Sequence, residues 1–131
     1  MHVKVVDASA LGALVFGEPA AKKIAVILDM SSLAAPSLLQ YELASICLKK
    51  IQSDPQKTEL ILEAFHLADR LNIDMLAVDH TDVIQLAQQL NLTTYDASYL
   101  WLAKHLDGKL VTLDQRLAKA AGRSMITEGM A

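Results

Sequence analysis

The stretch VKVVDASA, residues 3–10, decides the fold because it joins a strand to a helix through a single acid. Residues 3–6 form a short run rich in β-branched side chains, which predicts a buried strand. Asp7 follows this run directly and precedes a helical stretch. The same order returns near the end of the chain, where the apolar run 110–113 is followed by Asp114 and another helical stretch. Both copies predict a strand that carries an acid at its carboxyl end.

The rest of the chain alternates between strand-like and helical segments. Further strands are expected at 33–35, at 73–78 and, as a possible last strand, at 124–127. Helices are expected at 8–14, 19–28, 37–51, 56–71, 82–90, 95–106 and 114–121. Strands that alternate with helices and read as apolar runs indicate a parallel sheet covered on both faces. We therefore expect an α/β fold whose functional residues gather at the carboxyl ends of its strands.

Length and composition favour one domain with its own core. The chain has 131 residues, 53% of them hydrophobic, so a single domain is expected over residues 1–131. No apolar run approaches the roughly 18 residues that cross a bilayer, and the charges of Lys4 and Asp7 argue against a signal peptide. Cys47 is the one cysteine and forms no intramolecular disulfide. These features predict a cytoplasmic protein without a membrane segment.

Several common chemistries lack their sequence motifs. The chain contains no GxxxxGK(S/T) phosphate loop, no GxGxxG turn, no GxSxG nucleophile elbow and no Cys/His cluster with zinc spacing. A phosphatase of the Asp-x-Asp type needs an acid at position 9, where Ser9 stands. A phosphate-receiver domain needs paired acids after its first strand and a late strand-end lysine, and the sequence has neither.

Four carboxylates from separate segments are the candidate site: Asp7, Glu42, Asp96 and Asp114. Each has a structural alternative, since the three aspartates precede helical stretches as N-caps do, and Glu42 lies in a polar helix stripe. Taken together, carboxylate oxygens suit Mg²⁺ or Mn²⁺, which assist phosphodiester hydrolysis by activating water. The formal net charge of −3 speaks mildly against nucleic acid, but neutralising the four acids changes it to +1.

Residues near these acids supply further candidates. Thr112 lies two positions before Asp114, so in a strand both side chains share one face. The Thr112 hydroxyl is therefore expected to hold a metal-bound water or the Asp114 carboxylate, unless it is only a β-branched strand residue. Asp79 also ends a strand-like run, but it is adequately explained as the start of a helix. Lys49 and Arg116 are candidates for phosphate contact, although lysines and arginines on helices are mostly solvated.

Three aromatic residues, Tyr95, Tyr99 and Trp101, cluster in sequence beside Asp96. Stacking aromatics often select RNA. Tyr99 and Trp101 suit a core or a subunit interface equally well.

The sequence resembles the PIN domain family over nearly its whole length, and within it most resembles VapC-type toxins of toxin–antitoxin pairs. Four stretches carry the resemblance, in family order: VVDASA at 5–10, APSLLQYELA at 35–44, TYDASYLWLA at 94–103 and LVTLDQRLA at 110–118. The Tyr-Asp-Ala core of the third stretch is the most specific of them.

The resemblance implies a three-layer α/β/α domain with a parallel sheet of about five strands. It also implies a Mg²⁺- or Mn²⁺-dependent endoribonuclease that hydrolyses RNA phosphodiester bonds, in which Asp7, Glu42, Asp96 and Asp114 bind metal and carry catalysis. The spacing of Thr112 to Asp114 adds Thr112 to the catalytic candidates. A homodimer and a cognate antitoxin protein are implied as well. Two alternatives stay open: a catalytically inactive PIN-like module that binds RNA or protein, and a housekeeping RNA-processing nuclease.

Overall fold

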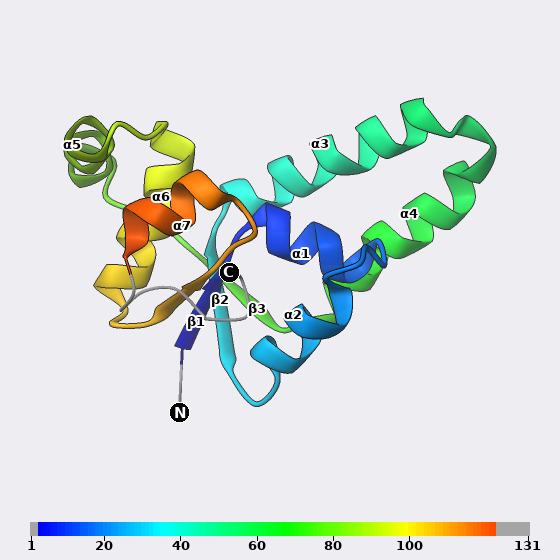
Figure 1. The fold of residues 1–131 in the computed structure, drawn as a ribbon, viewed down its shortest axis with the longest axis horizontal. Coiled ribbons are helices and arrows are strands. Elements are labelled where there is room, and N and C mark those ends of the chain that lie inside the picture. The colour runs from blue at the N-terminus through cyan, green and yellow to red at the C-terminus, as the bar shows by residue number, and fades with distance from the viewer. Residues whose placement is uncertain (1–2, 123–131) are drawn as a thin grey trace.

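The computed structural model describes residues 3–122 and shows the expected alternation of strands and helices (Figure 1). In chain order the elements are β1 (Val3–Val6), α1 (Ala8–Val15), α2 (Ala21–Leu28), β2 (Ser32–Pro36), α3 (Leu38–Ser53), the 3₁₀ turn η1 (Pro55–Lys57), α4 (Thr58–His66), the 3₁₀ turn η2 (Leu67–Arg70), β3 (Ile73–Leu76), α5 (His80–Leu90), α6 (Thr94–His105), β4 (Lys109–Val111) and α7 (Gln115–Ala121).

The strands form one parallel sheet in the order β3-β2-β1-β4. In β1, Val5 pairs with Ala34 of β2 on one side and with Leu110 of β4 on the other. The chain therefore adds β2 and β3 on one side of β1 and then returns to add β4 on the other side of β1. The gap beyond the carboxyl ends of β1 and β4 is a topological switch point, where open α/β sheets place their ligands.

The α/β fold with helices on both faces of a parallel sheet is confirmed, with four strands in the described residues instead of about five. The expected strand 124–127 lies outside the described residues. The expected strand 110–113 ends earlier, at Val111. Its partner β1 ends at Val6, and the backbone N–H of Asp7 makes the last bond, to the Val111 carbonyl at 3.2 Å. Because α1 begins at Ala8, directly after Asp7, β1 offers no further residue with which Thr112 could pair.

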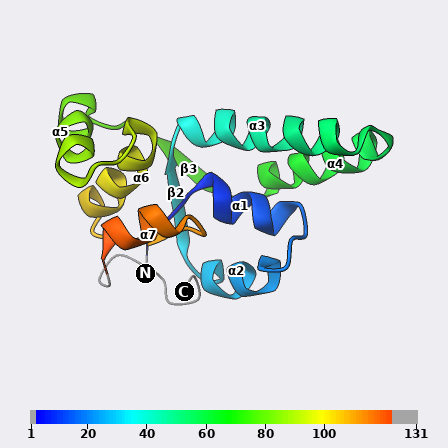
Figure 2. The same ribbon diagram turned by 45° about the horizontal axis from the view of Figure 1, so that its top comes forward.

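Two groups of helices enclose the sheet, and both ribbon views agree on their sides (Figures 1 and 2). Helices α5, α6 and α7 lie on one side, where α6 packs against β1, β2 and β4. Helices α1 to α4 lie on the other, and α3 and α4 run out from the sheet as a pair. No helix within residues 3–122 is long and apolar enough to cross a membrane.

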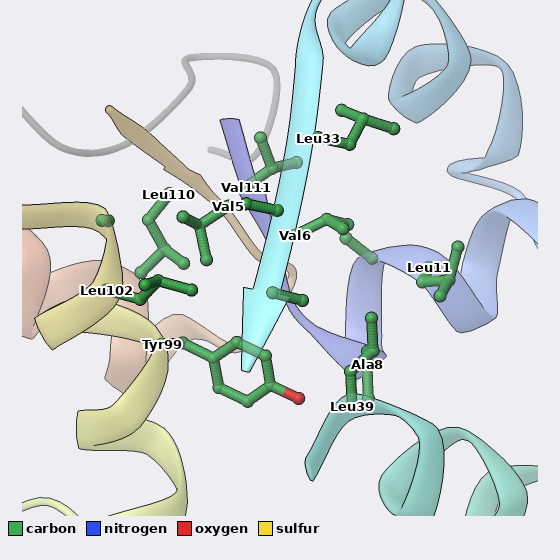
Figure 3. Packing of buried hydrophobic residues seen from close by; sticks show 14 of the residues in the cluster. Val5, Val6, Ala8, Leu11, Leu33, Leu39, Tyr99, Leu102, Leu110 and Val111 are labelled. Carbon is green, nitrogen blue, oxygen red and sulfur yellow. The ribbon is translucent and has the colours of Figure 1, made fainter. Parts of the chain in front are cut away.

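The two strands at the switch point form the centre of the core. Val5, Val6, Leu110 and Val111 are fully buried, as a strand covered on both faces requires. Figure 3 shows Tyr99 of α6 reaching past the end of the sheet, with its hydroxyl directed toward the start of α3. A buried tyrosine hydroxyl requires a polar partner, so a polar group is expected at that point.

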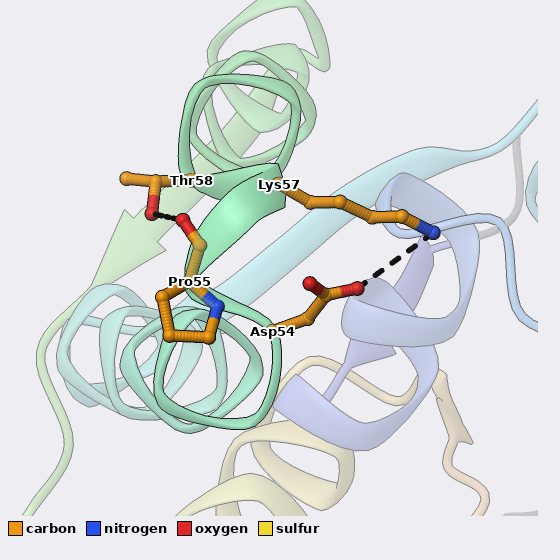
Figure 4. A network of polar contacts seen from close by, with 4 residues as sticks. All are labelled: Asp54, Pro55, Lys57 and Thr58. Atoms are coloured by element: carbon orange, nitrogen blue, oxygen red, sulfur yellow. Dashed lines mark hydrogen bonds and ion pairs between the residues drawn. The ribbon is translucent and has the colours of Figure 1, made fainter.

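The turn that joins α3 to α4 is held by local polar contacts (Figure 4). Asp54 and Pro55 end α3, since proline cannot continue the helix. The Thr58 hydroxyl donates to the Pro55 carbonyl at 2.6 Å, and Lys57 Nζ lies 3.8 Å from Asp54 Oδ2. The expected helix 56–71 is therefore divided, with η1 before α4 and η2 after it.

A glycine at the start of β4 allows two backbones to meet. Gly108 follows Asp107, which has a positive φ of 51°, and a Cβ atom on Gly108 would lie 2.7 Å from the carbonyl oxygen of Val3. We expect Gly108→Ala to push β4 away from β1 and to lower the free energy of unfolding by about 1–3 kcal/mol in urea denaturation.

The matched control for this variant is Gly12→Ala in the middle of α1. A Cβ atom there meets only side-chain atoms, of Ile46 at 3.4 Å and of Leu43 at 3.9 Å, which are ordinary contact distances, and alanine favours the helix. Gly12→Ala should leave stability equal or raised, and an equal loss in both variants would contradict the backbone argument.

Candidate active site

Asp7 occupies the switch point and is buried there, with 5% of its surface exposed. Its carboxylate accepts three hydrogen bonds. Oδ1 accepts from the Ala10 backbone N–H at 3.0 Å, which caps α1, and from the Ser9 hydroxyl at 2.7 Å. Oδ2 accepts from the Thr112 hydroxyl at 2.5 Å. The capping interpretation of Asp7 is therefore correct, but capping uses only part of this carboxylate.

Burial raises the pKa of Asp7 to about 6, because the charged form loses its hydration. The hydrogen bonds from Thr112, Ser9 and Ala10 lower the pKa and offset part of this effect, while the nearby charge of Asp114 raises it. The fold thus holds an acid where its ionised form is costly, which is typical of functional sites.

Thr112 and Ser9 connect the chain after β1 to the chain after β4. The Thr112 hydroxyl, fully buried, donates to Asp7 and accepts from the Asp114 backbone N–H at 2.9 Å. Ser9 Oγ accepts from the Leu113 backbone N–H at 2.9 Å. The expected contact between the Thr112 hydroxyl and the Asp114 carboxylate is therefore wrong: the hydroxyl holds the Asp7 carboxylate and only the backbone of Asp114.

Asp114 follows β4 and caps α7, accepting from the Leu117 backbone N–H at 3.1 Å. The side chain is partly exposed, unlike that of Asp7. Because β1 and β4 are neighbours, Asp114 lies close enough to Asp7 to raise the pKa of that carboxyl. The charge of Asp114 also raises the pKa of Asp96.

Asp96 lies in the first turn of α6 and is not the helix cap, contrary to the capping interpretation. Thr93 is the cap: its hydroxyl accepts from the Asp96 backbone N–H at 3.0 Å. Partial burial and then the charge of Asp114 raise the pKa of Asp96, whereas Arg116 and the Thr93 hydroxyl lower it. The Asp96 carboxylate is thus not used as a helix cap and belongs to the cluster of acids. The guanidinium of Arg116 lies near enough to lower its pKa.

Glu42 lies in the second turn of α3 and is half-buried rather than on a fully solvated stripe. Its Oε1 accepts from the Tyr99 hydroxyl at 2.6 Å, which is the polar partner that the buried ring requires. Partial burial raises the pKa of Glu42, the Tyr99 hydrogen bond lowers it, and the charge of Asp96 raises it. Burial and then Glu42 raise the pKa of Tyr99 far above its ordinary value, so Tyr99 stays a neutral donor.

The four predicted acids therefore form one electrostatic group. Asp7 is coupled to Asp114, Asp114 to Asp96, and Asp96 to Glu42. Within residues 3–122, no three His, Cys, Asp or Glu side chains stand as a ready-made metal-binding group. The donors fit a divalent cation by chemistry, because all are carboxylate oxygens and their mutual repulsion is what a cation between them relieves.

Other candidates lie apart from this group. Asp79 follows β3, at the edge of the sheet two strands from β1, and caps α5 by accepting from the Asp82 backbone N–H at 3.0 Å. Lys49 lines a separate cavity of about 640 Å³ between α3 and α4, which none of the four acids lines. Arg116 is the phosphate candidate that the structure does bring to the acids.

The hydrogen bonds of Ser9 and Tyr99 are not predicted by the sequence. By local sequence Ser9 is an ordinary early-helix serine, yet its hydroxyl donates to Asp7 Oδ1 and accepts from the Leu113 backbone N–H after β4. The sequence around Tyr99 suits a core or an interface equally well. In the structure its ring is buried in the core and its hydroxyl donates to Glu42. No local signal marks Ser9, because its partner Leu113 lies 104 positions away in the sequence.

Comparisons with known proteins show what the chain is similar to. Residues 4–123 match the family described as PIN domain. The chain is 30% identical over 120 residues to Ribonuclease VapC3 of Pyrobaculum aerophilum, covering 88% of this chain and 92% of that protein. The crystal structure of PAE2754 from Pyrobaculum aerophilum is similar with a TM-score of 0.79 and 26% identity, covering 97% of this chain and 90% of that one.

The raised pKa of Asp7 predicts a pH dependence of stability in the metal-free protein. A carboxyl with a higher pKa in the folded chain stabilises the fold at low pH, and this contribution is lost as the pH rises through about 6. We expect Asp7→Asn, which keeps the cap, to be more stable than wild type by on the order of 2–3 kcal/mol at pH 7.5 with chelator present. Urea denaturation should show the gain falling to roughly half at pH 5. If the stability gained by Asp7→Asn were the same at pH 5 and pH 7.5, the raised pKa of Asp7 would be contradicted.

The Tyr99 hydroxyl makes a separate prediction about Glu42. Tyr99→Phe keeps the buried ring but removes the donor that lowers the pKa of Glu42. The Glu42 carboxyl should then titrate at higher pH, as measured by NMR of side-chain carboxyl carbons. Tyr95→Phe, on the same helix but with an exposed side chain, serves as the control and should leave the Glu42 titration in place. An unshifted Glu42 in Tyr99→Phe would show that the bond does not tune this acid.

Proposed function

The chain belongs to the PIN domain family, and on that premise we propose that it is a metal-dependent endoribonuclease that hydrolyses RNA phosphodiester bonds. The observation that carries the proposal is a group of four carboxylates from four separate segments. Asp7 and Asp114 follow the neighbouring strands β1 and β4. Asp96 and Glu42 lie near enough for the charge of one to raise the pKa of the other, and the charge of Asp114 raises the pKa of both Asp7 and Asp96. The likeness to a protein named as a ribonuclease, across 88% of this chain, supports the same reaction.

Asp7, Glu42, Asp96 and Asp114 are the residues that would hold Mg²⁺ or Mn²⁺. When bound, such a cation lowers the pKa of the attacking water and offsets charge on the phosphate and the leaving oxygen. In the hydrolysis, the water oxygen bonds to phosphorus, one P–O ester bond breaks, and the leaving oxygen takes up a proton. No protein nucleophile is required for this scheme.

The role of the surrounding residues is to hold these acids in place. Thr112 and Ser9 fix the two Asp7 oxygens, and Tyr99 fixes Oε1 of Glu42. We therefore assign Thr112 as a positioning residue for Asp7. Arg116, next to Asp96, is the cation placed to meet a substrate phosphate, since a guanidinium pairs well with phosphate oxygens.

For the biological role, we propose the toxin of a VapBC-type toxin–antitoxin pair, a cytoplasmic homodimer formed by one nuclease domain over residues 1–131 and held in check by a cognate antitoxin. The relative named Ribonuclease VapC3 supports this role. A housekeeping RNA-processing nuclease would use the same site. An inactive binding module is the weaker alternative, because it has no need to keep four mutually repelling acids.

Cleavage of a structured RNA by the purified chain with Mn²⁺ or Mg²⁺ tests the proposal. EDTA should stop cleavage, and Asp7→Asn or Glu42→Gln should lower the rate at least 100-fold, since each removes a charged ligand without removing much volume. Melting curves of both variants should stay cooperative.

Asp79→Asn is the matched control for this test. Asp79 also follows a strand and caps a helix, and asparagine caps as well as aspartate. Because Asp79 lies at the far edge of the sheet, its variant should cleave at the wild-type rate. Retained cleavage in both Asp7→Asn and Glu42→Gln would overturn the assignment of the site.

A further inference from the structure

Two tyrosines stand exposed beside the acids. Tyr41 precedes Glu42 on α3 and is 78% exposed, while Tyr95 precedes Asp96 on α6 and is 63% exposed. Large aromatic side chains usually bury much of their surface, and the other tyrosine, Tyr99, is 1% exposed. Neither exposed ring contributes to the core, so their position next to the site calls for another explanation.

Both rings line one hollow of about 340 Å³, which we call the tyrosine hollow: Leu38, Tyr41, Glu42, Ser45 and Tyr95. A second hollow of about 300 Å³ shares Leu38 and Tyr95 with the first and is otherwise lined by His80, Val83, Ile84, Thr94 and Ser98. Tyr95 and Leu38 therefore separate two adjacent spaces. The tyrosine hollow is continuous with the acids, because Glu42 lines it and belongs to them.

The charges around the hollow favour an uncharged, flat occupant. No lysine or arginine lines either space among the described residues, and Glu42 puts a negative charge at the edge of the first. A phosphate is therefore disfavoured there. The cation that the structure places beside the acids is Arg116, on the start of α7 rather than in either hollow.

We propose that the tyrosine hollow binds the base of a nucleotide next to the cleaved phosphate of single-stranded RNA, with the base stacked on Tyr95 or Tyr41. The proposal rests on the proposed function, because cleavage at the acids requires the neighbouring nucleotide to pass over residues that adjoin Glu42. Aromatic rings bind bases of any sequence through their faces, and only unpaired RNA exposes those faces. The hollow therefore favours unpaired RNA over duplex.

Binding of a short single-stranded RNA to an uncleaving protein tests the subsite directly. Asp7→Asn serves as the background, because Asp7 does not line the hollow. In that background, Tyr95→Ala or Tyr41→Ala should weaken binding about 5- to 150-fold in fluorescence anisotropy, the range for one lost base stack. Tyr95→Phe and Tyr41→Phe should bind as the background does. Leu48→Ala, which changes a 54% exposed apolar side chain on α3 outside the hollow, is the control and should have no effect.

An abasic nucleotide moved along the same RNA gives an independent readout. At one position the missing base should weaken binding by the same factor as the alanine variant, and the two losses should not add, because both remove one contact. Fully additive losses at every position, or unchanged RNA binding in both alanine variants, would overturn the subsite. Variants that bind RNA normally but pair less well with a protein partner would assign the hollow to that partner and overturn it too.

These outcomes are distinct from failure of the nuclease assignment. Wild-type RNA cleavage that EDTA stops, together with unchanged RNA binding by Tyr95→Ala and Tyr41→Ala, rejects the subsite and keeps the nuclease. Absence of metal-dependent cleavage by wild type rejects the nuclease, while the binding measurements still decide whether the hollow takes a base.

Discussion

At the point where β1 and β4 end side by side, the Asp7 carboxylate accepts hydrogen bonds from Thr112, Ser9 and the first turn of α1. These bonds join the two halves of the chain, since more than 100 residues separate Asp7 from Thr112. The start of α1, the end of β4 and the position of Asp114 all depend on the same carboxylate. A side chain without acceptors at position 7 would take one acceptor away from the hydroxyls of Thr112 and Ser9 and from the Ala10 backbone N–H.

The acids around this contact work against the stability of the fold. Burial and mutual repulsion raise the pKa of Asp7, Glu42 and Asp96, so each charge is held where it is unfavourable in the absence of a cation. A buried Tyr99 donor and the Arg116 guanidinium reduce the cost without removing it. A cation among these carboxylates would offset part of this cost, which is the physical reason for proposing a divalent ion there.

Much of the architecture could be predicted from the chain alone, because apolar runs followed by acids mark the ends of parallel strands. The expected helices 37–51 and 95–106 match α3 and α6 to within two residues at each end. The four acids that the motifs single out lie near enough to affect one another's pKa. Contacts between distant segments could not be predicted: that Thr112 holds Asp7 rather than the Asp114 side chain depends on β4 ending at Val111, which pairing with β1 decides. Thr93 as the cap of α6 was missed because Asp96 is an equally good capping residue by local preference.

The assignment of the α6 cap to Thr93 has an evolutionary consequence. Asp7 and Asp114 each begin a helix, so a substitution that removes their oxygens damages the fold as well as the site. The Asp96 side chain does not cap α6, because the Thr93 hydroxyl does. A lineage that loses selection for activity can therefore discard Asp96 first and keep a folded chain, so the residue at position 96 is the most informative one to compare between working and silent descendants of this domain.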